Sequence, residues 1–305
     1  MVMSRTEVEQ LAAGAQPLLE LYQKGEHHAL LAEVDHLSRS GPLPPDVLGL
    51  AAASLVALQR YEEAATAARG AVRQAPRTAW LHHVLSQAEL GRGEKGPALE
   101  AADTACRLLP GHPDYLATLA ACQRESGDAV AAAATARRAL VGAPTHAGAL
   151  NQLGLALAAS GDEAGALEQF VRAQQAAPRE PEAYLNEAAL HRKARRVPEA
   201  RRALRAALQQ NPGLLEAEEQ LAETLTASPL VHGLLKHLIH LSRLTLTGWA
   251  IVAFLYYLFF RLLEFLWKHF AVMLPVGRVL LAVAAAWLLG GALAGRLVRA
   301  LLRRA

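Results

Sequence analysis

Blocks of apolar residues with a helical period follow one another through residues 11–227 of this chain. Within each block, apolar side chains recur three or four residues apart, which predicts amphipathic α-helices of about a dozen residues. Short polar stretches that contain glycine or proline separate the blocks and predict turns. After residue 228 the pattern changes, because two long segments there carry no charged residue. We therefore expect a helical repeat region followed by a different C-terminal part.

A single interval governs the helical region. Six prolines lie 34 residues apart, and two series of alanines keep the same step. The prolines are Pro42, Pro76, Pro110, Pro144, Pro178 and Pro212, and the alanines are Ala64, Ala98, Ala132, Ala166 and Ala200, then Ala71, Ala105, Ala139, Ala173 and Ala207. A fixed period of this length is the signature of a solenoid. The predicted parts are a tail at 1–10, a degenerate repeat at 11–44, full repeats at 45–78, 79–112, 113–146, 147–180 and 181–214, and a final helix at 215–227.

Each recurring residue type has a structural reason. Gly93, Gly127 and Gly161 fall in the turn between the two helices of a repeat, where glycine accepts the left-handed conformation that ends a helix. The proline ends the second helix because it lacks an N–H and clashes with the preceding turn. The alanines allow two helices to approach closely. Since one such helix pair cannot bury its apolar face alone, neighbouring repeats are expected to stack.

These residues resemble the tetratricopeptide repeat (TPR), a helix-turn-helix unit of the same length. The copy at 147–180 matches best, with Leu153-Gly154 in its first helix, Gly161-Asp162 at the turn, Ala166 and Phe170 in its second helix, and Ala173 and Pro178 at its end. The other full copies have Ala52, Ser86, Ala120 and Ala188 in place of the first-helix glycine. The resemblance implies an all-α, right-handed TPR-type α-solenoid that binds other proteins.

In TPR proteins the first helix of each repeat lines a groove that holds a partner. By register, the resemblance implies a partner groove formed by His83, Gln87, Thr118, Asn151, Gln152, Asn186 and Arg192. Some family members grip a peptide's C-terminal carboxylate with lysine, arginine and asparagine at particular groove positions. Those positions hold Gly49, Ala53, Val84, Asp114 and Thr118 here, so we do not expect that mode of binding.

The sequence carries no recognisable catalytic motif. It has no glycine-rich phosphate loop, no Gly-x-Ser-x-Gly elbow and no zinc-type Cys/His spacing. The adjacent pair His82-His83 points to different helix faces and is not expected to chelate a metal. Cys106 and Cys122 are interpreted as small core residues, with a disulfide or redox pair as the alternative. We therefore expect a protein that is not an enzyme and uses no cofactor or metal.

The C-terminal part predicts a membrane hairpin. Residues 228–243 have the pattern of an amphipathic juxtamembrane helix, and 244–260 and 279–295 are each 17 residues without a charge. Segments of about 20 apolar residues span a bilayer, so 244–305 is expected to form two transmembrane helices with a basic tail. A pair of buried helices in a soluble domain is the alternative.

Charges beside the apolar segments set the expected orientation. Six lysines and arginines flank the outer ends of the hairpin and three lie in its loop, so the repeats are expected on the cytoplasmic side of a bacterial inner membrane. Small residues at helical spacing would let the hairpin helices, two copies of the chain, or another membrane protein pack closely. These residues are Ala286, Gly290, Gly291, Ala294 and Gly295.

A basic cluster lies in the last full repeat. It contains Arg192, Lys193, Arg195, Arg196, Arg201, Arg202 and Arg205. The cluster is interpreted either as a solvated face or, at Arg195, Arg196, Arg201 and Arg202, as a patch that faces anionic lipid. Nucleic acid is not the expected partner, because no aromatic residues interleave with the arginines to stack on bases. The net charge of +3 is also too small to imply a polyanionic partner.

Together these features predict a membrane-anchored, cytoplasm-facing TPR scaffold that binds an unidentified protein or peptide in its groove. The alternative is an accessory subunit of an integral membrane enzyme or transporter, with the hairpin as its main contact. A soluble adaptor with buried C-terminal helices is a further alternative.

Overall fold

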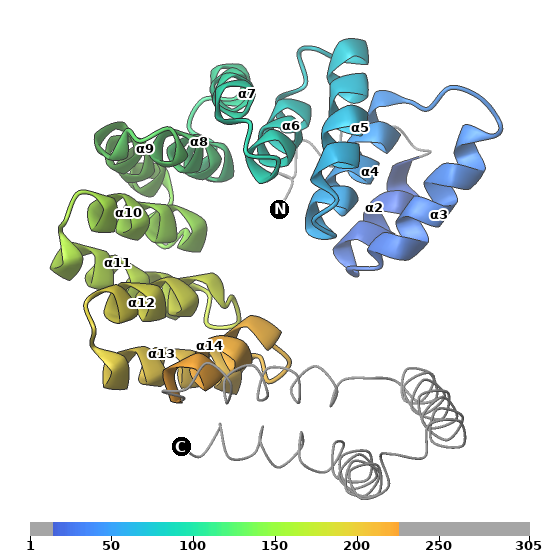
Figure 1. The fold of residues 1–305 in the computed structure, drawn as a ribbon. Helices are drawn as coiled ribbons and strands as arrows, with labels where there is room; N and C mark the ends of the chain where they lie inside the picture. Colours follow the sequence, from blue (N-terminus) through green and yellow to red (C-terminus); the bar gives the residue numbers. More distant parts are fainter. Residues whose placement is uncertain (1–14, 226–305) are drawn as a thin grey trace, which may run out of the picture. The chain divides into compact units, whose positions relative to one another are not determined.

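The structure, a computed structural model, describes residues 15–225. These residues form thirteen α-helices and no strand (Figure 1). The helices are α2 (Gln16–Gln23), α3 (His27–Ser38), α4 (Pro45–Ala57), α5 (Tyr61–Gln74), α6 (Ala79–Gly91), α7 (Lys95–Leu108), α8 (Pro113–Glu125), α9 (Ala129–Gly142), α10 (Ala147–Ala159), α11 (Glu163–Ala176), α12 (Glu182–Lys193), α13 (Val197–Gln210) and α14 (Leu215–Leu225). The expected all-α fold is confirmed for this part of the chain.

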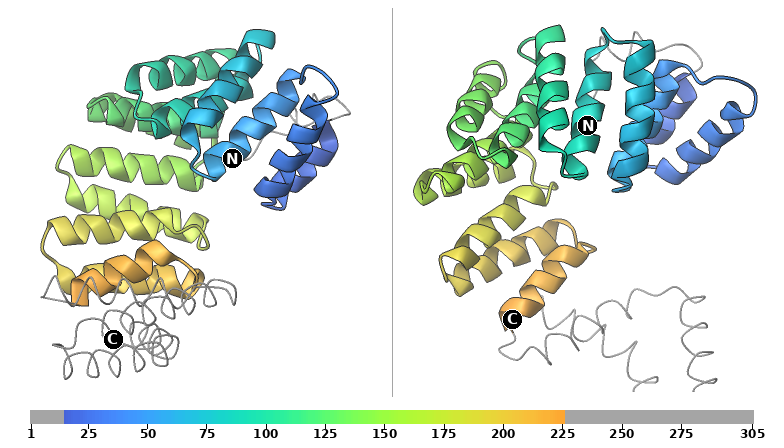
Figure 2. Two further views of the ribbon diagram at one scale, coloured as in Figure 1. Left: turned by 45° about the vertical axis from the view of Figure 1, so that its right-hand side comes forward. Right: turned by 45° about the horizontal axis from the view of Figure 1, so that its top comes forward.

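The helices belong to two units, which are described separately. The first unit ends at Pro178 and holds α2 to α11, and the second begins at Arg179 and holds α12 to α14. In the first unit each helix packs against the next along the chain, and α4, α6, α8 and α10 also contact one another in succession. Figure 2 shows this stacking of helix pairs from two further directions. In the second unit α12 packs on α13, and α13 on α14.

The turn between the two helices of a repeat has the same backbone in every copy described. Residues at the same repeat position adopt a positive φ: Gly25, Gln59, Gly93, Gly127, Gly161 and Arg195. In each turn the next backbone N–H donates to the carbonyl five residues earlier, as Asp162 does to Leu157 at 3.0 Å. This hydrogen bond satisfies a carbonyl at the helix end. The conformation holds even where the residue is not glycine, since Gln59 and Arg195 both have a φ of 59°.

Proline sets the end of each second helix. The residues before five of the periodic prolines are Ala75, Leu109, Ala143, Ala177 and Asn211, and all have φ between −141° and −130°. The ring of the following proline disfavours the helical region for the residue before it, which explains this shared conformation. The period seen in the sequence is therefore a period of local backbone conformations.

The alanine series form the contacts between helices. All ten alanines are at most 2% exposed. Where the second helix has a large side chain, the first helix has glycine. A Cβ added to Gly154 would lie only 2.6 Å from Cε1 of Phe170, so the glycine leaves room for this ring. Ser86, at the equivalent position of another repeat, is buried and donates to the carbonyl of Ala98 at 2.9 Å. Small residues at this position thus keep paired helices close.

Glu89 is a charged side chain buried within the first unit. It is 1% exposed, and its two carboxylate oxygens each lie 2.6 Å from an arginine nitrogen, one of Arg69 and one of Arg92. Arg92 also pairs with Glu62 of the preceding repeat at 2.6 Å. These ion pairs link α5 and α6, and they compensate the cost of burying the Glu89 carboxylate.

The predicted localisation in a bacterial inner membrane needs correction. Among residues 15–225, no helix is long and apolar enough to span a membrane. The longest helices there have 14 residues, or about 21 Å at 1.5 Å per residue, against about 30 Å of hydrocarbon. We therefore do not carry the membrane localisation further. The segments behind it, 228–243 and 244–305 with Ala286, Gly290, Gly291, Ala294 and Gly295, lie outside the described residues.

Candidate functional site

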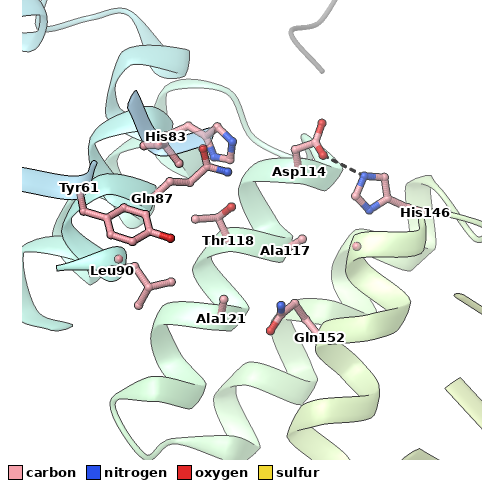
Figure 3. A pocket seen from close by; sticks show the side chains of 13 residues that line it. Tyr61, His83, Gln87, Leu90, Asp114, Ala117, Thr118, Ala121, His146 and Gln152 are labelled. Carbon is pink, nitrogen blue, oxygen red and sulfur yellow. Dashed lines mark hydrogen bonds and ion pairs between the residues drawn. The ribbon is translucent and has the colours of Figure 1, made fainter. Parts of the chain in front are cut away.

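The first unit contains an open groove of about 450 Å³ across successive repeats (Figure 3). The first helices α6, α8 and α10 supply most of its lining, and α4 and α5 add one residue each. The lining residues are Val56, Tyr61, His83, Gln87, Leu90, Gly91, Asp114, Ala117, Thr118, Ala121, His146, Gly148 and Gln152. Stacking of the repeats creates this groove, since it brings residues about one repeat apart onto one surface.

Four of the seven residues expected in a partner groove line it. These are His83, Gln87, Thr118 and Gln152. Asn151 of α10 is not among the lining residues, and it is 9% exposed.

The other two expected groove residues, Asn186 and Arg192, lie on α12 in the second unit. Arg192 donates to the Gln220 amide oxygen at 3.2 Å and pairs with Glu223 at 3.0 Å. This arginine therefore joins α12 to α14.

His83 is a buried polar side chain in the groove lining. Its side chain packs on the Tyr115 ring with centroids 4.8 Å apart, and only 2% of the residue is exposed. Burial lowers the pKa of His83 to about 4, so the imidazole is neutral at pH 7. Its Nδ1 atom has no hydrogen-bond partner among the described residues. Such an atom is costly to bury, unless a bound molecule supplies the missing bond.

Asp114 and His146 form a hydrogen-bonded pair at one side of the groove (Figure 3). His146 precedes α10 and its Nδ1 accepts the backbone N–H of Ala149 at 3.1 Å. In a neutral imidazole the proton must then be on Nε2, which donates to Oδ1 of Asp114 at 3.1 Å. Burial alone would raise the pKa of Asp114. The hydrogen bond from His146 stabilises the ionised carboxylate, and the pKa of Asp114 lies below its usual value.

Tyr61 completes the opposite side of the groove. A Cβ added to Gly91 would lie 2.2 Å from the Tyr61 ring, so the absence of a side chain at Gly91 lets that ring lie against α6. Figure 3 shows the Tyr61 hydroxyl, the Gln87 amide and the Thr118 hydroxyl pointing into the same space.

Three polar lining residues, Tyr61, Asp114 and His146, were not expected from the sequence as groove members. Tyr61 begins a second helix and His146 precedes a first helix, so a register based on first helices omits both. Asp114 was considered only because it occupies a position where some TPR proteins have a basic or amide residue that binds a peptide's C-terminal carboxylate. The one sequence signal for His146 is its place at the start of a first helix, a position that His112 occupies one repeat earlier.

Part of the basic cluster of the last full repeat forms contacts with other residues of the same unit. Arg201 donates to the backbone carbonyl of Thr224 and to its hydroxyl, which ties α13 to α14. Arg196 is the N-cap residue of α13, while Arg195 and Arg202 are exposed. The lipid-facing interpretation of Arg195, Arg196, Arg201 and Arg202 depended on the membrane localisation and is not carried further.

The two cysteines are free thiols in the first unit. Cys122 is buried with its Sγ 3.3 Å from the Ser86 hydroxyl, and Cys106 is partly buried. Burial raises the pKa of Cys106 to about 11, so little of it is thiolate at neutral pH. Both residues therefore act as packing groups.

Comparisons with known proteins identify the fold. No family model matches the chain, and no curated protein matches it. Among solved structures, a TPR protein of Thermus thermophilus is 24% identical with a TM-score of 0.55, covering 59% of this chain and 98% of that one. A chain of the APC/C hetero-tetramer Cut9–Hcn1 is 18% identical with a TM-score of 0.59; the match covers 72% of this chain and 44% of that one. The type IV pilus biogenesis factor PilW is 18% identical with a TM-score of 0.50, covering 64% of this chain and 91% of PilW. The described residues thus have the fold of TPR proteins.

Proposed function

We propose that this protein is a non-catalytic scaffold that binds a segment of a partner protein in the groove formed by α6, α8 and α10. The TPR fold supports an interaction role, and one solved structure with this fold is of an assembly, Cut9 with Hcn1. That likeness concerns the fold alone. The choice of this groove as the binding site comes from its own chemistry.

The proposal rests on one observation: the groove lining contains buried polar atoms that have no hydrogen-bond partner among the described residues. The Nδ1 atom of His83 and the Oε1 atom of Gln152 are both buried, and neither has a hydrogen-bond partner among the described residues. Most buried polar side-chain atoms in proteins are hydrogen-bonded. Two unsatisfied atoms in one groove indicate that a ligand with its own donors and acceptors completes the surface.

Site-specific photo-crosslinking tests the proposal. A photoreactive amino acid replaces Thr118 in the full-length chain, and cross-linked proteins are identified from cells. A matched control carries the same amino acid at Glu100, an exposed residue of α7 that is not part of the groove lining. We expect a cross-link to a discrete partner protein from position 118 and none from position 100.

Substitutions in the groove supply the second part of the test. Gln87→Lys with Gln152→Lys adds two positive charges and longer side chains to the lining, and Gln175→Lys changes an exposed glutamine of α11 outside the groove. The double substitution to lysine should abolish the cross-link while circular dichroism stays unchanged, and Gln175→Lys should preserve it. If the double variant captures the same partner as the wild type, the binding site lies elsewhere.

A further inference from the structure

The charge balance of the groove indicates the chemistry of its partner. Among the thirteen lining residues, Asp114 is the only one with a carboxylate, and there is no lysine or arginine. His146 does not neutralise that charge. Its Nδ1 accepts a backbone N–H and its Nε2 donates to Asp114, so the imidazole is uncharged in this arrangement. The pair Asp114–His146 therefore carries one net negative charge.

The second carboxylate oxygen of Asp114 remains available. Only Oδ1 takes part in the hydrogen bond to His146, and Oδ2 has no hydrogen-bond partner among the described residues. A partly buried carboxylate with one free oxygen favours a cationic donor, because charge-assisted hydrogen bonds are about twice as strong as neutral ones.

The remaining lining suits the backbone of an extended peptide. Ala117, Ala121 and Gly148 have small side chains or none, so a peptide main chain can approach the helices closely. Gln87 and Gln152 present side-chain amides, each able to donate to and accept from a peptide unit. The buried His83 ring adds a nitrogen without a hydrogen-bond partner among the described residues.

We propose that the groove binds an extended peptide segment with a lysine or arginine side chain, and that the cation of this side chain pairs with Asp114. The inference rests on the proposed function, and it further specifies that the bound segment has a positively charged side chain. It is the opposite of a carboxylate clamp, in which basic residues of the groove hold a negatively charged peptide end.

Peptide selection tests the charge assignment. A phage-displayed library of random dodecapeptides is selected on the purified full-length chain, in parallel with its Asp114→Asn and Asp114→Lys variants. Asp114→Asn is isosteric and can still accept the bond from His146, so the start of α10 should be undisturbed. Glu100→Gln removes an exposed carboxylate of α7 and serves as the matched control.

We expect the wild type and Glu100→Gln to enrich lysine or arginine at one peptide position. Asp114→Asn should lose that enrichment, and Asp114→Lys should select aspartate or glutamate there. For a capped synthetic copy of the selected peptide, Asp114→Asn should weaken binding by roughly tenfold to a hundredfold, the loss expected for a hydrogen bond to a charged group.

Two results would overturn the inference, and they are distinguishable. The cation assignment would be wrong if peptides that bind in the groove showed no preference for lysine or arginine. It would also be wrong if such a preference survived Asp114→Asn. In both cases the groove would remain a binding site. Failure of the wild type to select any peptide whose binding is weakened by Gln87→Lys with Gln152→Lys would count against groove binding itself, and the cation assignment would fall with it.

Discussion

Acidification should destabilise the protein through His83. This histidine is neutral and buried in the native structure, with its pKa lowered from 6.5 to about 4, and it regains its ordinary pKa on unfolding. Above pH 6.5 neither state binds the proton, and the full stability is present. Between pH 6.5 and 4 the unfolded chain binds a proton that the native state excludes, so stability falls as the pH is lowered, by about 1.4 kcal/mol per pH unit. Integrated from pH 7 to pH 5, the loss from this side chain is about 2 kcal/mol.

The assay compares the wild type with His83→Phe, which keeps a ring against Tyr115 but cannot titrate. The free energy of unfolding is measured by urea denaturation at pH 7 and pH 5 for both proteins. The drop between these pH values should be about 2 kcal/mol smaller in the variant. Carboxylates and histidines that lie away from His83 contribute equally to both proteins and cancel in the comparison. Equal drops, or a histidine resonance of His83 that titrates near pH 6.5 by NMR, would show that the imidazole is not buried as described.

Three further predictions concern stability and are checked by chemical denaturation. Glu89→Ala should cost about 2 kcal/mol, because it leaves two arginines without their shared buried partner; a change below about 0.5 kcal/mol would mean that the ion pairs contribute nothing. Gln59→Gly should stabilise by up to about 1 kcal/mol by relieving a positive φ, whereas Gln59→Ala should not, and equal effects would contradict the strain. Gly154→Ala should destabilise by about 1–3 kcal/mol, because the new methyl group meets Phe170, and Phe170→Leu should restore part of the loss; no loss in Gly154→Ala would refute the close contact.

Much of the fold could be predicted because the residues that determine it act locally. A proline restricts the residue before it whatever the rest of the chain does, and the backbone before Pro76 or Pro144 follows that rule. Glycine at 93, 127 and 161 permits the left-handed turn in the same way. A period of 34 residues in such residues therefore predicted the helix pairs and their ends.

Local residues could not predict the turns at Gln59 and Arg195. Neither side chain favours a positive φ, yet both residues adopt it. The flanking helices each pack on their neighbours, and their packing requires the same turn as in the glycine repeats. Tertiary contacts here outweigh a cost of about 1–2 kcal/mol.

The groove depended still more on tertiary structure. The sequence by itself determined a stack of helix pairs and, through the family register, that residues such as His83 and Gln152 face a common side. It did not determine that Tyr61 closes one side, that Asn151 is buried, or that His146 holds Asp114 from 32 positions away. Those features arise only when neighbouring repeats are stacked, because the distance between two side chains one repeat apart is fixed by helix packing and not by their separation along the chain.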